Sequence, residues 1–353
     1  MPATPPPITP HTAPAAPHAP RGGEGGAALL TVLLLVALMA VVSATAVQRL
    51  TLSTRVAASA AAIQQAQFYQ LAVETALVRQ LSNTADAPRA ALARGGTQAG
   101  RMALPGGAWV DYQLDDGGNC FNINSLVAPP GAANPSGENL ATQAQFRALL
   151  TAIGVTPAAV EPIVSGATDW IDADSNPRAN GRESATGPGG GAPIIAPNRP
   201  VTDASEIMAM GAITPPDWAK MLPWLCALPT HAPSPININT LRPEQAPLLQ
   251  MLTAQPGLGA TDATAILPIG QARAAIAARP AGGYRTAATI WAAPAMAGYA
   301  PPAQAADQLV VAPQWIKLQS DIRVGDVTLS ADALIDVNAI GARVVRRKWK
   351  PNA

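Results

Sequence analysis

The longest apolar run of the chain lies near its N-terminus. Residues 27–47 read AALLTVLLLVALMAVVSATAV and contain no charged side chain. At 1.5 Å per residue, a helix of about 21 residues matches a hydrocarbon layer about 30 Å thick. We therefore expect residues 27–47 to form a transmembrane helix. A cleaved secretory signal is the alternative, but its apolar region is only about 7 to 15 residues long and ends at a small-residue cleavage site.

The helical pattern continues beyond this apolar run. From Gln48 to Leu81 there is no proline or glycine. Five residues recur at helical spacing on one face: Phe68, Leu71, Ala72, Thr75 and Val78. We expect one helix of about 50 residues, first lipid-soluble and then amphipathic, that ends no later than Pro88. Such a helix suits anchoring in a membrane and packing among like helices.

Strand patterns occur on both sides of a long helical region. Apolar and polar residues alternate from Trp109 to Leu114. Three further candidates lie in the tail: Trp315–Val324, Val327–Asp336 and Ala342–Trp349. The first two are separated by Gly325-Asp326, a typical hairpin turn. The pattern predicts an α+β fold, in which a long N-terminal helix lies on an antiparallel sheet and a large helical domain is inserted between the strands.

Charge and composition narrow the class of protein. The formal net charge is only +1, so we expect no extended nucleic-acid surface. A basic cluster occurs at the C-terminus, which we interpret as a solvated strand end: Arg343, Arg346, Arg347, Lys348 and Lys350. The chain has only two cysteines, Cys120 and Cys226, both after the apolar run. In a periplasmic location they would form a disulfide worth roughly 4 kcal/mol by loop closure; two buried free thiols are the alternative.

The start of the apolar run resembles a known processing site. Gly26 is followed by Ala27 and an uncharged helix, as at the prepilin peptidase site of type IV pilins and pseudopilins, where cleavage follows the glycine. Pilins and major pseudopilins usually carry Glu at mature position five. That position is Thr31 here, a departure that resembles one minor pseudopilin, the general secretion pathway protein K family of type II secretion systems.

Later stretches resemble the same family in their order and spacing: Asp116 through Cys120-Phe121-Asn122-Ile123-Asn124, Asp169-Trp170-Ile171-Asp172-Ala173-Asp174, Asn198-Arg199-Pro200 and Pro235-Ile236-Asn237-Ile238-Asn239-Thr240. The resemblance implies a pilin-like fold and a position at the tip of the secretion pseudopilus. There the subunit would initiate assembly with minor pseudopilins I and J and support export of folded proteins across the outer membrane. It also implies processing by prepilin peptidase, N-methylation of Ala27, and a single-pass inner-membrane anchor with a periplasmic C-terminal domain.

The expected domain organisation follows from these features. Residues 1–26 are a disordered prepilin leader and residues 27–47 the transmembrane part of the helix. Residues 48–120 hold the rest of the pilin helix and the first strand. Residues 121–305 form the inserted helical domain, with a calcium loop and a helix-hairpin-helix-like module. Residues 306–353 supply the C-terminal strands of the pilin sheet.

An acidic stretch suggests a cation site. Oxygen-bearing side chains occupy the first, third, fifth, ninth and twelfth positions of an EF-hand spacing: Asp172, Asp174, Asn176, Asn180 and Glu183. The sixth position is Pro177, where that loop needs glycine, so an EF-hand is not expected. The family resemblance implies calcium in the helical domain, and we interpret the stretch as a structural calcium loop. The alternative is a solvated acidic loop of turn-forming residues.

The region from Ile236 to Arg279 suggests the main rival function. It resembles helix-hairpin-helix modules, which often bind DNA phosphates through a glycine hairpin and basic residues. Here Pro256-Gly257-Leu258-Gly259 is flanked by Asp262 and no lysine, so a structural helical module is favoured over a membrane-anchored DNA-uptake protein. The sequence also offers no nucleophile and base pair or phosphate-binding motif, so we expect no enzyme.

Overall fold

The computed structural model describes residues 24–82, 92, 97–129, 131, 139–187, 191–257, 266–338 and 341–350 of the chain. It divides into two compact units, residues 1–61 and 62–353. The main helices are α1 (Glu24–Ser82), α3 (Leu140–Ala152), α4 (Pro157–Ile171), α5 (Pro215–Met221), α6 (Ala246–Met251), α7 (Ile269–Ala277) and α8 (Ala303–Gln308). The strands are β1 (Gln98–Ala103), β2 (Trp109–Asp116), β3 (Phe121–Asn122), β4 (Ser184–Gly187), β5 (Gly191–Ile195), β6 (Leu225–Cys226), β7 (Ile236–Asn237), β8 (Leu309–Val310), β9 (Trp315–Val324), β10 (Val327–Asp336) and β11 (Arg343–Trp349).

Helix α1 confirms the prediction of one long N-terminal helix. It comprises 59 residues, and the part from Gly26 onward is long and apolar enough to cross a membrane. In the first unit, the side chains of residues 26–61 are all exposed. The helix begins at Glu24, within the segment 1–26 that we expected to be a separate leader. Residues 1–23 lie outside the described part of the chain.

In the second unit, the C-terminal part of α1 packs against the sheet through a mixed stripe of residues. Its buried side chains include Val73 and Leu77, but also the polar Gln70 and Glu74. The face predicted from hydrophobic spacing is a different one: Phe68 and Leu71 are 72% and 48% exposed. The helix therefore buries a stripe containing two polar residues and leaves apolar side chains on its outer face.

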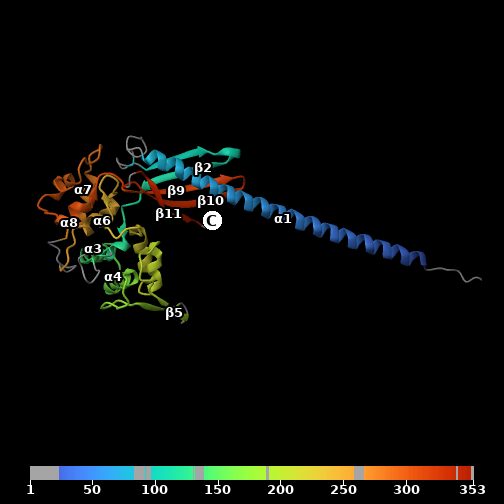
Figure 1. Ribbon diagram of the computed structural model, residues 1–353, viewed down its shortest axis with the longest axis horizontal. Coiled ribbons are helices and arrows are strands. Elements are labelled where there is room, and N and C mark those ends of the chain that lie inside the picture. The colour runs from blue at the N-terminus through green and yellow to red at the C-terminus, as the bar shows by residue number, and fades with distance from the viewer. Residues whose placement is uncertain are drawn as a thin grey trace, which may run out of the picture. The chain divides into compact units, whose positions relative to one another are not determined.

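The main sheet has five antiparallel strands in the order β1-β2-β9-β10-β11 (Figure 1). Strands β9 and β10 have the predicted bounds, and Gly325 in the turn between them has φ 56°, a conformation that favours glycine. Alternate residues such as Leu318 and Ile322 point into a core shared with α1, while strand β1 at one edge was not predicted. Strand β11 closes the other edge, with one irregularity of register opposite Leu334 and Ile335.

Helices α3, α4, α6 and α7 gather around a second hydrophobic core (Figure 1). Phe121 stacks on Phe146 there, with ring centroids 4.6 Å apart. These helices lie between β2 and β9 in sequence, although those strands are neighbours in the sheet. The expected α+β arrangement, a long helix on an antiparallel sheet with a helical insertion, is therefore confirmed.

The helical insertion consists of two repeats with matching hydrogen bonds, which we name the first repeat (residues 121–228) and the second repeat (residues 236–311). Each begins with a similar sequence, FNINSL at 121–126 and ININTL at 236–241. Asn124 accepts a hydrogen bond from the Val201 backbone N–H (2.8 Å) and donates to the Val201 carbonyl (2.9 Å). Asn239 makes the same pair of bonds to the backbone of Tyr284, at 2.7 and 3.0 Å.

The equivalence extends to the end of each repeat. The asparagine side chains also donate to the carbonyls of Leu228 and Val311, at 2.9 and 3.0 Å respectively. Each opening strand pairs in parallel with a returning one, β3 with β6 and β7 with β8. One buried asparagine thus fixes three distant carbonyl or amide groups in each repeat, satisfying backbone groups that burial would otherwise leave unpaired.

Candidate functional site

The expected processing junction lies inside α1. Beyond the backbone of its own helix and its chain neighbours, Gly26 has no atom within 4 Å of the position that a Cβ would occupy. Five residues into the expected mature chain, the Thr31 hydroxyl donates to the Ala28 carbonyl of the same helix at 2.9 Å. Threonine commonly satisfies its hydroxyl in this way within a helix. Position five therefore presents a short neutral side chain bonded to its own backbone.

The acidic loop begins at the C-terminal end of α4. Asp172 caps this helix, and its backbone N–H donates to the Thr168 carbonyl at 2.9 Å. Asp172, Asp174 and Glu183 each offer one carboxylate oxygen, and the three oxygens lie within 4.8 Å of one another. The structure thus brings together the three carboxylates that the sequence spacing singled out. Strand β4 follows Glu183 directly.

Two oxygens of this acidic cluster lack the hydrogen bonds that buried oxygens need. Asp172 is 3% exposed, and its Oδ1 is buried with no hydrogen-bond partner, as is Oε1 of Glu183. Burial raises the pKa of Asp172, against hydrogen bonding from Arg178. Burial and the neighbouring carboxylates, first Asp172, raise the pKa of Glu183. The surroundings of Asp172 and Glu183 therefore disfavour their ionised forms, and the described part of the loop does not fully compensate for their negative charge.

Arg178 supports the acidic cluster from one side. Its Nη1 donates to Oδ1 of Asp169 at 2.7 Å and also to Oδ2 of Asp172. Asp169 is fully buried, so it needs this cation. Asp172 uses Oδ2 for Arg178, while its Oδ1 is buried without a hydrogen-bond partner. The sequence reasoning did not identify Arg178.

Asn198 is a second residue that the spacing argument missed. Its amide nitrogen donates to the carbonyl of Asp174 and to the Ser175 hydroxyl, the latter at 3.2 Å, while its Oδ1 is buried without a partner. Two other predicted ligands lie in the loop as turn formers. The backbone N–H of Asn176 donates to Asp174 Oδ1 at 2.8 Å, and Asn180 is exposed with φ 67°. Their roles as ligands stay predictions.

These residues fit a hard divalent cation. Carboxylate and amide oxygens are the ligands that calcium prefers, and three buried oxygens here are unpaired: those of Asp172, Glu183 and Asn198. Asp169 would remain with Arg178, outside the ligand set. A cation held by the convergent carboxylates of Asp172, Asp174 and Glu183 would neutralise part of their negative charge.

The two cysteines form a disulfide bond in the structure, with an S–S distance of 1.99 Å. Cys120 precedes β3 and Cys226 ends β6, so the bond lies beside the parallel strand pair that closes the first repeat. Asn122, two residues after Cys120, accepts from the Leu228 N–H at 3.0 Å. The disulfide and the hydrogen bonds that join the beginning of the first repeat to its end therefore lie next to each other.

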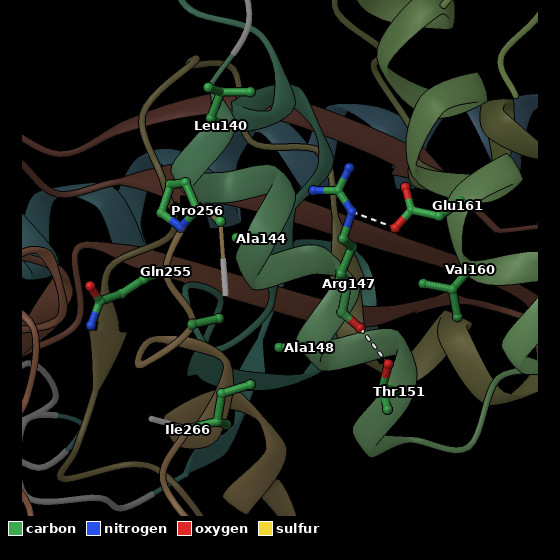
Figure 2. A pocket seen from close by; sticks show the side chains of 12 residues that line it. Leu140, Ala144, Arg147, Ala148, Thr151, Val160, Glu161, Gln255, Pro256 and Ile266 are labelled. Atoms are coloured by element: carbon green, nitrogen blue, oxygen red, sulfur yellow. Dashed lines mark hydrogen bonds and ion pairs between the residues drawn. The ribbon is translucent and has the colours of Figure 1, made fainter. Parts of the chain in front are cut away.

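A groove of about 420 Å³ lies between α3, α4 and residues 254–257 (Figure 2). Its lining is mainly apolar, including Leu140 and Val160. Its charged side chains are Arg147 and Glu161, which point toward each other in Figure 2 and pair at 2.6 Å. Because these charges satisfy each other, the described lining of the groove is mainly a packing surface.

The helix-hairpin-helix-like region lies in the second repeat. Arg279, the basic residue at the end of this region, donates from Nη1 to the carbonyls of Ile238 and Leu241 at 3.2 and 2.7 Å. This guanidinium therefore stabilises the turn after β7. Gly257 has φ 83°, whereas Leu258, Gly259 and Asp262 of the predicted hairpin lie outside the described residues.

A long helix with an apolar first half, packed by its second half on an antiparallel sheet, defines the pilin-like class of proteins. Two family models, both described as type II secretion system protein K, match residues 119–230 and 236–312. These ranges correspond closely to the two repeats. The chain belongs to the type II secretion system protein K family and is a minor pseudopilin.

Relatives support the same assignment. Type II secretion system protein K of Pectobacterium carotovorum is 29% identical, covering 81% of this chain and 84% of that protein. The Pseudomonas aeruginosa protein K is 31% identical over 56% and 60% of the two chains. The fold also matches a chain in the crystal structure of the GspK-GspI-GspJ complex from enterotoxigenic Escherichia coli, with TM-score 0.62, 25% identity, and coverage of 82% and 97%.

Proposed function

We propose that this chain is the tip subunit of the type II secretion pseudopilus. In this role it starts pseudopilus assembly with minor pseudopilins I and J and supports export of folded proteins across the outer membrane. The single observation that carries the proposal is the likeness to a chain of a solved K–I–J complex over 82% of the residues. The apolar helix and the absence of an acidic residue at Thr31 give independent support.

The residue at mature position five, Thr31, explains why growth of the pseudopilus would stop at this subunit. In pilins the glutamate at this position is thought to satisfy the N-terminal amine of the neighbouring subunit. Thr31 carries no charge, and its hydroxyl bonds to Ala28 within the helix. It therefore has no carboxylate for an amine of a subunit stacked above. The large insertion between β2 and β9 adds bulk that would oppose further stacking.

The anchor sets the location that we propose for the chain. Prepilin peptidase would cleave between Gly26 and Ala27, and Ala27 would then be N-methylated. The apolar part of α1 would span the inner membrane once, with the remaining domain in the periplasm. The bond between Cys120 and Cys226 supports a periplasmic domain, because disulfides persist in that oxidising compartment.

The acidic cluster would hold a structural calcium ion. Asp172, Asp174 and Glu183 would supply carboxylates, because one oxygen of each lies within 4.8 Å of the others. Asn198, which donates to the Asp174 carbonyl and whose own Oδ1 is unpaired, would supply an amide oxygen. Calcium at about 100 times its Kd should raise the free energy of unfolding by about 2.7 kcal/mol, seen as a higher Tm. Asp172→Ala with Asp174→Ala should remove this shift. An unchanged Tm in calcium and in chelator would end the calcium proposal.

DNA binding by residues 236–279 is the second function that we considered. It would need free cations at the hairpin, but Arg279 is engaged with Ile238 and Leu241. The region also belongs to a protein K family model. Both observations favour a structural module, and we propose no nucleic-acid partner.

Co-purification tests the tip assignment. The full chain should be co-expressed with minor pseudopilins I and J of the same bacterium, extracted in mild detergent and separated by size. We expect one complex containing all three proteins. The major pseudopilin of the same bacterium, expressed with this chain alone, is the control and should not form a stable complex. Separate elution of K, I and J would contradict the proposed partners.

A further inference from the structure

A second pocket, which we name the β11 pocket, lies between strand β11 and the first repeat. Its volume is about 300 Å³, at the lower end of the range for small-ligand sites, and none of its lining residues belongs to the acidic cluster. The Asn124 side chain brackets the backbone of the buried Val201, as Asn239 brackets Tyr284 in the second repeat, so this part of the lining is fixed. The rim includes two exposed prolines, Pro200 and Pro229, so the pocket opens to solvent.

Arg346, which lines this pocket, differs from the rest of the C-terminal basic cluster. The four other members each pair with a carboxylate: Arg343, Arg347, Lys348 and Lys350. Arg346 pairs with no carboxylate of the described residues. Its Nη1 donates instead to the carbonyls of Thr202 and Ala227, the latter at 2.9 Å. One half-buried cation of the pocket therefore lacks an anionic partner within the described part of the chain.

The unused edge of the Arg346 guanidinium is the edge that binds carboxylates elsewhere in this chain. Arg347 and Arg101 use Nε and Nη2 to hold both oxygens of one carboxylate, those of Glu74 and Asp111 respectively. In Arg346 these two nitrogens make no hydrogen bond to a described residue, and neither is sealed from solvent. Because a guanidinium and a carboxylate match in two parallel hydrogen bonds, this edge favours a carboxylate ligand.

His231 supplies a second unsatisfied group to the lining of the pocket. Its Nδ1 is buried and has no hydrogen-bond partner among the described residues. A buried polar atom without a partner costs free energy, which a ligand recovers by bonding to it. At this nitrogen an imidazole can accept a hydrogen bond from an N–H or donate one to an oxygen. A ligand that carries an N–H close to its carboxylate therefore suits the pair formed by Arg346 and His231.

The apolar part of the lining limits what else the ligand can be. Val201, Ala227 and Val345 line the pocket, and the first two are buried. A doubly charged phosphate would meet this apolar surface with a single arginine beside it, and acetate would leave most of it uncovered. A carboxylate on an apolar group of amino-acid size covers the surface while its charge meets Arg346. The open rim leaves an exit for a chain that continues from such a group.

We propose that the β11 pocket binds the C-terminal residue of a polypeptide that ends in an apolar side chain. The terminal carboxylate pairs with Nε and Nη2 of Arg346, and the terminal amide N–H donates to Nδ1 of His231. The apolar side chain packs on Val201, Ala227 and Val345, and the rest of the polypeptide leaves over the rim. This site is independent of both the acidic cluster and the tip role.

A ligand-observed NMR titration of the full chain in detergent micelles tests this site. N-acetyl-leucine mimics the terminal residue, and N-acetyl-leucinamide lacks only the carboxylate, so the amide also reports any uptake of the probe by micelles. We expect the acid to bind at least about tenfold more tightly than the amide. Acetate lacks the apolar body and 4-methylpentanoate lacks the amide group, and each should bind at least about threefold more weakly than N-acetyl-leucine.

Three variants connect binding to the named side chains. Arg346→Lys keeps the charge but loses the two-nitrogen edge, and it should weaken binding of N-acetyl-leucine about tenfold. The control Arg323→Gln removes a positive charge from β9 near its turn and should leave binding unchanged within about twofold. His231→Ala should weaken binding about threefold, and it should remove the histidine ring signal that shifts when the acid binds to the wild-type chain. The Tm of each variant shows whether it is folded.

The comparison of ligands on the wild-type chain does not depend on the folding of any variant. Equal binding of the acid and the amide, or equal losses in Arg346→Lys and Arg323→Gln, would exclude a carboxylate site at Arg346. Acetate that binds as tightly as N-acetyl-leucine would exclude a role for the apolar lining. If 4-methylpentanoate binds as tightly, the ligand is a free acid and the assignment to a chain terminus is wrong.

Discussion

The guanidinium of Arg347, in strand β11, forms two hydrogen bonds with the carboxylate of Glu74, in helix α1. Nε donates to Oε1 at 2.7 Å, and Nη2 donates to Oε2. Gln70 donates to the same carboxylate at 2.8 Å and accepts from the Ser320 hydroxyl. A polar network therefore connects helix α1 to two strands of the sheet, within an otherwise apolar interface.

Removing Glu74 should cost much more stability than removing an exposed ion pair. Glu74→Ala leaves Arg347 partly buried without its partner, so we expect the free energy of unfolding to fall by about 2–4 kcal/mol. The control is Arg101→Ala, which breaks the exposed pair with Asp111 and should cost no more than about 1 kcal/mol. Denaturant unfolding of the two variants measures both values. Equal losses would contradict the importance assigned to the buried network.

The bracketing asparagines should stabilise their own repeats. Asn124→Ala leaves the amide and carbonyl of Val201 unpaired in a buried site, and Asn239→Ala does the same at Tyr284; we expect a loss of about 2–4 kcal/mol for each. Hydrogen exchange should rise chiefly in the repeat that carries the substitution. Asn338→Ala, at an exposed position, is the control. Uniform loosening of both repeats by either variant would argue against two separate brackets.

The disulfide should stabilise the first repeat in particular. Cys120 and Cys226 are 106 positions apart, and replacing both by serine should lower the free energy of unfolding by about 2–5 kcal/mol. A reducing agent should produce the same loss in the wild-type chain and no further loss in the double variant. A reduced wild-type chain as stable as the oxidised one would show that the bond has no structural role.

Stability should fall in acid partly through Asp203. Burial alone would raise the pKa of Asp203, but hydrogen bonds from Lys348 and Ser205 outweigh it and hold the pKa below its ordinary value of 3.8. A carboxyl whose pKa is lower in the folded than in the unfolded chain adds stability at pH values above the unfolded pKa. This contribution is lost as the pH falls from the unfolded pKa through the folded pKa. Asp203→Asn and Lys348→Met should therefore flatten the decline of stability below about pH 4. An unaltered decline in both variants would exclude this contribution.

Strands and the long helix could be predicted because their patterns are local. The alternation in Trp315–Val324 and Val327–Asp336, with Gly325 in the turn, matches β9 and β10 in full. The buried face of α1 could not be predicted in this way, because it includes Gln70 and Glu74. The hydrogen-bond partners of these two residues lie in strands far away in sequence. Strand β1 reads QAGRMA, with no strong alternation of apolar and polar residue types, although its side chains alternate between half-buried and exposed at the sheet edge.

The candidate site was predictable only in part for the same reason. Acidic spacing identified Asp172, Asp174 and Glu183, which converge. Arg178 and Asn198 join them through loop geometry that no short motif encodes. The two repeats left a readable signal, the pattern x-Asn-Ile-Asn-(Ser or Thr)-Leu at 121–126 and again at 236–241, but its meaning depends on backbone groups distant in sequence.

The mature N-terminus tests the central claim most directly, because the proposed tip role depends on cleavage between Gly26 and Ala27. The chain should be purified from bacterial inner membranes that contain the matching prepilin peptidase, and its N-terminal peptide measured by mass spectrometry. We predict a chain that begins at Ala27 with a methylated amine, and an uncleaved chain in a peptidase-deficient strain. An intact leader in the presence of the peptidase, or cleavage at any other residue, would contradict the account.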